Sequence, residues 1–470
     1  MKQSPLGTWS RRDFLGASVA AALGAPWLSG AQSAPAPGFT HRALNGWITD
    51  LATEPDPNAA WPSMRLDEGL LKDYRETFAL MRRVGFNEIV IWGLYTTNNW
   101  PLDLKSAVPP ERGRKVEQLI ASAHEQGIKV LSGLGTYSWG FAEIIKANPK
   151  LNGGNANAMC ASEPASHAWM ERVLDFVFTR FLIDGVSMQS ADQGRCKCAR
   201  CAKLGDAEYH AQLLARTADT IHGRWPGKIV GMSNWGVSFG NPRDKAAFAK
   251  LSRSLDYMID YNDSARWGGP RYRREFIAAL GCALGTTGGP VVEPPQHWAR
   301  DRWFLPSCRA VHRHLQALRG DGGRACEFFF HILANPSSEL TWHVAGRTLA
   351  DPQAALEKHL QAALEELYQP RDAATRDALA QFFLEAEEAY LRHLPKDECG
   401  TLSLEPLVGN RPGPPVYLRD RLKPEQRSVY AAEMERLAGV FSKLQPALQS
   451  KPRVERLAAC LAAVRKDVQT

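Results

Sequence analysis

The fold is decided by residues 165–190, which read ASHAWMERVLDFVFTRFLIDGVSMQS. An amphipathic segment, Ala165–Phe181, passes through the turn residues Ile183-Asp184-Gly185 into a short apolar run, Val186–Ser190. Apolar residues at helical spacing predict a helix, and a short apolar run bounded by turn residues predicts a buried strand. This stretch therefore predicts a helix that leads directly into a strand of a parallel sheet.

The same alternation repeats on both sides of this stretch. The predicted strands are Ala43–Thr49, Glu88–Leu94, Lys129–Leu134, Val186–Ser190, Ile229–Ser233, Tyr257–Tyr261, Cys282–Thr286 and Cys326–His331. Amphipathic segments separate them, so each strand begins a βα unit. Eight such units are typical of a TIM barrel, and an open doubly wound sheet is the alternative. We expect an α/β fold with a (β/α)8 barrel over residues 40–350.

The pattern changes beyond residue 351, where long amphipathic segments follow one another without strands between them. These segments are Pro352–Leu367, Ala373–Leu394 and Pro424–Leu444, and a Pro/Gly-rich link, Val408–Val416, interrupts them. Residues 351–470 are therefore predicted to form a helical C-terminal extension packed on the barrel.

The first residues have the order of an export signal. Ser10-Arg11-Arg12-Asp13-Phe14-Leu15 precedes a short apolar run, Phe14–Leu28, and small residues follow over Ser29–Ala34. This order predicts a twin-arginine signal peptide over residues 1–34. A membrane anchor is the alternative, but the run is short and rich in Gly and Ala. We expect a periplasmic or secreted protein that meets the twin-arginine export machinery and has no membrane contact after cleavage.

Composition and missing motifs exclude several other functions. The 57 Lys and Arg residues outnumber the 50 Asp and Glu residues only slightly, without a basic block interleaved with aromatics, so no nucleic acid partner is expected. Gly133-Leu134-Gly135-Thr136 lacks the third glycine of a dinucleotide site. The sequence has neither a haem-attachment motif nor the Gly-x-Ser-x-Gly motif of serine hydrolases. No cofactor is expected to be required for catalysis.

Barrel enzymes carry their catalytic groups at the carboxyl ends of the strands. In this sequence those positions hold Asp50, Trp92, Tyr137, Trp139, Gln189, Asp192, Trp235, Asp260, Glu293 and His331. Any one of these aspartates would more simply cap a helix or a turn. Together, carboxylates, amides and aromatics are what glycoside hydrolysis needs, because two carboxyl groups perform the chemistry and the others hold the sugar. The set predicts a glycosidase (an O-glycosyl hydrolase) with a carbohydrate substrate.

Three segments resemble a known group of proteins. Met159–Pro164 and Ser187–Cys201 are similar to bacterial glycoside-hydrolase-like barrel domains related to α-glucuronidases and β-N-acetylhexosaminidases, and Asn335–Pro352 resembles their eighth unit. Those domains share a Cys-x-Asn-Pro-like helix start, a polar residue with Asp after the fourth strand, and then Cys-x-Cys-x-x-Cys. The resemblance implies that Asp192 is the general acid. Gln193 stands where hexosaminidases have Glu, which argues against their substrate-assisted carboxylate pair.

The α-glucuronidase pattern takes the base from a later strand, which implies Glu293 or Asp260. The residues expected to bind substrate are Asp50, Trp92, Tyr137, Trp139, Gln189, Arg195, Trp235 and His331. Arg195 follows the acid segment, and a guanidinium fits a uronate carboxylate bidentately. The expected substrate is therefore a poly- or oligosaccharide, with uronic acid as one candidate component.

Two alternatives to hydrolysis stay open. Gln193 stands where hexosaminidases have the Glu of their carboxylate pair. The first alternative is therefore a carbohydrate-binding or scaffold protein that has the barrel fold but no catalytic activity. A polysaccharide lyase is the other alternative, with His331 or Tyr137 as its base.

Four cysteines have the spacing of a structural site. Cys196, Cys198 and Cys201 form a tight cluster in the sequence, and Cys160 lies upstream near the preceding unit. Four thiolates would suit a tetrahedral zinc ion, and one or two disulfides are the alternative. Either arrangement would be structural, because four thiolates leave no open position for catalysis.

Overall fold

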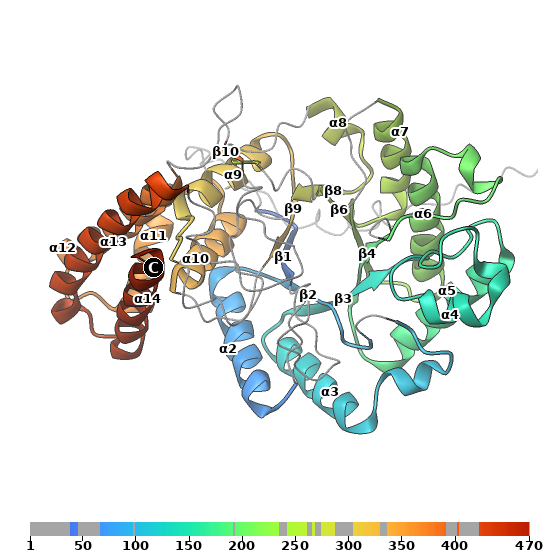
Figure 1. Ribbon diagram of the computed structural model, residues 1–470, viewed down its shortest axis with the longest axis horizontal. Helices are drawn as coiled ribbons and strands as arrows, with labels where there is room; N and C mark the ends of the chain where they lie inside the picture. The colour runs from blue at the N-terminus through green and yellow to red at the C-terminus, as the bar shows by residue number, and fades with distance from the viewer. Residues whose placement is uncertain are drawn as a thin grey trace, which may run out of the picture. The chain divides into compact units, whose positions relative to one another are not determined.

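The computed structural model describes residues 38–45, 66–96, 99–190, 193–234, 242–260, 266–267, 274–286, 304–329, 336–391, 402–403 and 423–469. Within these ranges eight parallel strands close into a barrel in the order β1-β2-β3-β4-β5-β6-β8-β9 (Figure 1). The strands are β1 His41–Asn45, β2 Glu88–Ile91, β3 Lys129–Gly135, β4 Gly185–Gln189, β5 Ile229–Ser233, β6 Tyr257–Asp260, β8 Ala283–Thr286 and β9 Ala325–Phe329. The predicted TIM barrel is confirmed.

Helices surround the barrel and connect successive strands (Figure 1). They are α2 Glu68–Val84, α3 Pro110–Glu125, α4 Ala142–Ala147, α5 Pro164–Arg180, α6 Asp206–Arg224, α7 Pro242–Leu251, α8 Arg274–Ala279, α9 Cys308–Gly320 and α10 Pro336–Ala350. Their ends follow ordinary capping rules. In α2 the side chain of Asp67 accepts a hydrogen bond from Leu70 N, and Gly85 ends the helix at a φ of 101°.

Aromatic rings fill part of the barrel interior, where they pack against glycines of neighbouring strands. A Cβ atom on Gly231 would lie 2.0 Å from Tyr257 Cζ, and one on Gly133 would lie 2.1 Å from Trp92 Cδ2. Small apolar and branched side chains complete this interior cluster: Ala43, Val90, Leu131, Ile229, Ile259 and Ala325. Because side chains alternate along a strand, these residues define which face of each strand points inward.

A buried carboxylate joins four strands inside the barrel. Glu327 of β9 accepts hydrogen bonds from Asn45 Nδ2 of β1 at 2.6 Å, Ser187 Oγ of β4 at 2.6 Å and Tyr257 OH of β6 at 2.5 Å. Burial raises the pKa of Glu327. A buried carboxyl is tolerated when several donors satisfy its oxygens, and here those donors come from three other strands.

The C-terminal helices pack as the sequence predicted. They are α11 Leu356–Tyr368, α12 Ala373–Leu391, α13 Pro424–Leu444 and α14 Lys451–Gln469. Their apolar core includes Phe304 and Leu340 from the barrel side, so both parts share one core. Glu387 of α12 accepts from the backbone N–H groups of Arg309 and Ala310 and so caps α9.

Two features of the fold were not predicted. The first is α14, although its buried residues have the helical spacing that could have revealed it: Val454, Leu457, Leu461, Val464 and Val468. The second is a two-stranded antiparallel pair of β7, Arg266–Trp267, with β10, Leu402–Ser403. Among the described residues, no helix is both long enough and apolar enough to cross a membrane.

The glycines inside the barrel give a direct test of this packing. Gly231→Ala is expected to lower the free energy of unfolding by about 1–3 kcal/mol or more, because the new methyl group overlaps the Tyr257 ring. Gly223→Ala on exposed α6 is the matched control, since its Cβ would meet nothing within 4 Å. The control should raise stability by about 0.5 kcal/mol. Equal denaturant midpoints for both variants would contradict this packing.

Candidate active site and metal centre

The carboxyl ends of the strands form the barrel mouth, where the sequence predicts the active site. Six of the predicted site residues lie among the described residues: Trp92, Tyr137, Trp139, Gln189, Arg195 and Asp260. Five predicted residues lie outside the described residues: Asp50, Asp192, Trp235, Glu293 and His331. The predicted signal peptide, residues 1–34, also lies outside them.

A strained loop, Gly135–Gly140, leaves β3 at the mouth. Tyr137 has a φ of 60° and Trp139 a φ of 53°, which is uncommon for residues other than glycine. Ser138 Oγ donates to the carbonyl of Ser190 at 2.5 Å, so the loop is bound to the end of β4. Backbone strain that neighbouring contacts hold in place is concentrated at functional sites.

Trp139 stacks on Trp92 beside this loop. The ring centroids are 4.7 Å apart with an interplanar angle of 15°. The Trp92 ring also packs against Gly133, and its buried indole nitrogen has no hydrogen-bond partner among the described residues. Trp92 therefore supports Trp139, and Trp139 is the aromatic that the strained loop presents at the mouth.

Tyr137 and Gln189 point in different directions. The Tyr137 hydroxyl is 2.7 Å from His167 Nδ1 of α5, among the helices outside the barrel, and burial raises its pKa to about 12. Gln189 lies two residues beyond Ser187, whose hydroxyl binds Glu327 in the barrel interior. Strand alternation therefore places Gln189 on the interior face, at the mouth.

Asp260 lies at the end of β6, next to β5. Its Oδ1 accepts a hydrogen bond from Asn234 Nδ2 at 2.8 Å, and its side chain is 7% exposed. Ile259 belongs to the interior cluster, so alternation places Asp260 on the helix-facing side of the strand. The structure therefore pairs Asp260 with Asn234 at the rim and does not direct it into the mouth.

Arg195 binds groups of its own loop and of the first turn of α6. Its guanidinium donates to the Leu204 carbonyl at 3.1 Å, to Asp206 Oδ1 at 2.7 Å and to the carbonyl of Cys201. It also lies over the Tyr209 ring, 4.3 Å from the centroid. The predicted uronate-binding residue is thus occupied by protein groups that fix the cysteine loop.

The four predicted cysteines meet in space. Their sulfur atoms all lie within 4.8 Å of one another, and those of Cys160 and Cys198 are 3.7 Å apart. Tetrahedral zinc with Zn–S bonds of about 2.3 Å separates its sulfurs by about 3.8 Å, whereas disulfide sulfurs are about 2.05 Å apart. All four are free thiols. The cluster has the donor set and spacing of a four-thiolate zinc site.

Backbone groups support the sulfurs. Cys198 N donates to Cys196 Sγ at 3.4 Å, and Cys201 N donates to Cys198 Sγ at 3.5 Å. Ser162 Oγ is 3.1 Å from Cys201 Sγ. N–H groups directed at thiolate sulfur stabilise its negative charge, so the loop is suited to a metal-bound state.

The segment between β3 and α5 connects this cluster to the mouth. A Cβ on Gly153 would lie 2.0 Å from Cys196 Sγ, and the Gly153 carbonyl accepts from Lys197 N at 2.8 Å. An antiparallel bridge pairs Ala158 with Ser138 of the strained loop. Sequence reasoning missed this connection, although Gly153-Gly154 is a turn signal shortly before Cys160.

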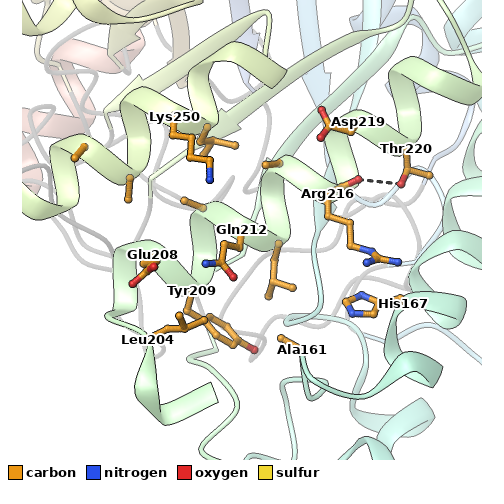
Figure 2. A pocket seen from close by; sticks show the side chains of 16 residues that line it. Ala161, His167, Leu204, Glu208, Tyr209, Gln212, Arg216, Asp219, Thr220 and Lys250 are labelled. Carbon is orange, nitrogen blue, oxygen red and sulfur yellow. Dashed lines mark hydrogen bonds between the residues drawn. The ribbon is translucent and has the colours of Figure 1, made fainter. Parts of the chain in front are cut away.

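A pocket of about 1060 Å³ lies on the outer side of the barrel, between α5, α6 and α7. Figure 2 shows the Arg216 guanidinium close to the His167 imidazole at one end and Lys250 at the other. Its wall mixes charges of both signs with small residues, and the described residues that line it include none of the predicted site residues. The mouth, where barrel enzymes carry their catalytic groups, is the candidate active site.

No protein-family profile and no curated protein matches this chain. Its fold is similar to that of a GH138 enzyme targeting pectin rhamnogalacturonan II, with a TM-score of 0.59 and 13% identity. The match covers 92% of this chain, which spans only 57% of that enzyme.

Two further solved structures have a similar fold. A mutant of the Thermobaculum terrenum O-GlcNAc hydrolase matches with a TM-score of 0.50 and 10% identity, over 86% of this chain and 78% of that one. CpGH84B matches with a TM-score of 0.52 and 12% identity, over 92% and 68% respectively. At these identities the likeness shows the fold alone.

The tryptophan stack has a spectroscopic consequence. Two stacked indoles couple their transitions, so the protein should show an exciton couplet in circular dichroism that Trp139→Phe removes. Trp225→Phe is the control, because Trp225 stacks on Phe178 and not on another indole. A couplet that survives in Trp139→Phe, or that Trp225→Phe removes equally, would contradict the stacked geometry.

Proposed function

We propose that this protein is a glycoside hydrolase whose active site is the barrel mouth. The observation that carries the proposal is the strained loop that presents Trp139 and binds the end of β4, two residues before Asp192. Flat apolar rings bind sugar faces, and a carboxyl group beside them can protonate the glycosidic oxygen. The fold shared with three glycoside hydrolases supports this proposal.

Asp192 is the general acid in this proposal. Glu293 supplies the second carboxylate, because Asp260 is paired with Asn234 on the helix-facing side of β6. Asp260 is the alternative base. Gln189 and Trp139 hold the sugar, and Trp92 supports the platform.

The proposed substrate is a poly- or oligosaccharide, with uronic acid as one candidate component. Arg195 does not carry the uronate preference, since its guanidinium is bound within the cysteine loop. The proposed site of action is the periplasm or the exterior, reached through the twin-arginine machinery by means of residues 1–34.

Purified mature protein should hydrolyse at least one member of a panel of aryl glycosides and uronate-containing oligosaccharides. Asp192→Asn is expected to lower kcat about 100- to 10,000-fold, the usual contribution of a general acid. Asp219→Asn on the exposed face of α6 is the matched control and should keep full activity. Full turnover in Asp192→Asn would remove Asp192 as the acid. Sugar binding without turnover on any substrate would favour a non-catalytic barrel.

We further propose that Cys160, Cys196, Cys198 and Cys201 bind a structural zinc ion. Their sulfur spacing supports this, and four thiolates would complete the coordination of the ion. Zinc would join the start of α5 to the loop after β4 without taking part in the chemistry. Export of the folded chain would allow zinc to bind in the reducing cytoplasm, before disulfides can form.

Elemental analysis should find about one zinc per chain in protein purified without added metal. Cys198→Ser should lose most of the zinc and melt at a lower temperature, because metal binding adds to folding free energy. Cys282→Ser, outside the cluster, should retain the metal. A zinc-free protein whose mass is lower by four hydrogens would instead establish two disulfides.

A further inference from the structure

We propose that Asn155 is a positioning residue that holds residues 193–195, the start of the chain that follows the proposed acid Asp192. The proposal rests on the hydrolase function proposed above and adds a residue that lies outside the barrel strands. It arises from one contact pattern, in which a single side-chain amide binds two carbonyls of the chain that follows Asp192.

Both hydrogens of the Asn155 amide have acceptors on this segment. Nδ2 is 2.9 Å from the carbonyl oxygen of Gln193 and 3.3 Å from that of Arg195. Its Oδ1 accepts from the backbone N–H of Asn157 at 2.9 Å. This last contact fixes the amide orientation, because the opposite orientation would direct an NH₂ group at an N–H group.

Gly194 explains how two carbonyls reach the same amide. It lies between Gln193 and Arg195 with a φ of 77°, a conformation that glycine adopts without strain. A Cβ at this position would lie 3.3 Å from Asn155 Nδ2. The left-handed turn thus brings the flanking carbonyls to one side, where Asn155 binds them.

The contacts of Asn155 add to other contacts made by residues that flank Asp192 in the sequence. On the amino side, the Ser190 carbonyl accepts from Ser138 Oγ, and the Ser190 hydroxyl is 3.1 Å from His210 Nδ1. On the carboxyl side, the cysteine cluster begins at residue 196. Gln193 directly follows Asp192 in the sequence. Of the carbonyls bound on either side of Asp192, that of Gln193, which Asn155 binds, is the nearest in sequence.

Loss of these contacts should affect catalysis more than stability. Asn155 is only half-buried, so water can satisfy both carbonyls when the amide is removed, and the stability cost is small. A displacement of about 1 Å in a catalytic group, however, can lower the rate about 100-fold. We therefore expect a large change in kcat, a small change in KM and full retention of the metal.

The test compares three variants with the parent protein. Asn155→Ala removes the amide, and Asn155→Asp keeps its shape but has no N–H to donate. Asn157→Ala is the matched control, because the exposed Asn157 contributes only its backbone N–H to these contacts. The readouts are kcat and KM on the substrate found by the glycoside panel, and cleavage of the Ala191–Asp192 bond by endoproteinase Asp-N.

Both Asn155 variants should lower kcat about 10- to 100-fold with KM within about twofold of the parent. They should also be cleaved at Ala191–Asp192 several times faster, because cleavage of a native chain follows local opening. Asn157→Ala should match the parent in both assays.

Unchanged kcat in Asn155→Ala, or unchanged cleavage at this bond, would overturn the proposal. Absence of turnover in the parent would overturn the hydrolase function and with it the catalytic part of this inference. The proteolysis comparison would still decide whether Asn155 holds the segment, so the two failures can be told apart.

Discussion

Four sulfur atoms meet beside the carboxyl ends of β3 and β4 and constrain the connections that follow these strands. Cys160 precedes α5, while Cys196, Cys198 and Cys201 follow β4, so the cluster joins two connections of neighbouring βα units. Gly153 must lie against Cys196 Sγ for the cluster to close. The turn that contains Gly153 therefore lies beside the segment after Asp192, and the contacts of Asn155 depend on that placement.

A series of contacts connects this cluster to Trp139, the residue proposed to bind the sugar. The same connection pairs Ala158 with Ser138, and Ser138 binds the end of β4 and precedes Trp139. The strain at Tyr137 and Trp139 is maintained by these contacts and by the stack on Trp92. The loop that carries Trp139 and the described residues on either side of Asp192 are thus held by one connected set of contacts.

The barrel interior beneath the mouth departs from the usual filling with branched apolar side chains. Glu327 has donors from three strands, and Tyr257 and Trp92 occupy space that side chains at Gly231 and Gly133 would otherwise take. Buried polar groups and close glycine contacts cost stability, and natural proteins keep such departures near functional sites. The polar interior therefore agrees with a functional mouth directly above it.

Periodicity in the sequence predicted the barrel, its eight strands and the helical extension, because burial on both faces of a parallel sheet leaves a strong local pattern. Cysteine spacing predicted the group that forms the sulfur cluster.

The stack of Trp92 on Trp139 and the contacts of Asn155 could not be predicted, because they join residues without regular structure across different connections. Counting alternation from Tyr257 predicts the helix-facing side of β6 for Asp260. The partners of Arg195 could not be predicted, because they are two carbonyls of its own loop and the Asp206 carboxylate at the start of α6.

Amide hydrogen exchange of residues 190–195 in the mature protein, measured with zinc bound and after chelation, tests most directly whether the proposed zinc site orders the chain around Asp192. Removal of zinc is expected to accelerate exchange in this segment and in residues 153–157, while α11–α14 keep their protection. Unchanged exchange in both segments would contradict the proposal that the sulfur cluster orders the segment that carries the proposed acid.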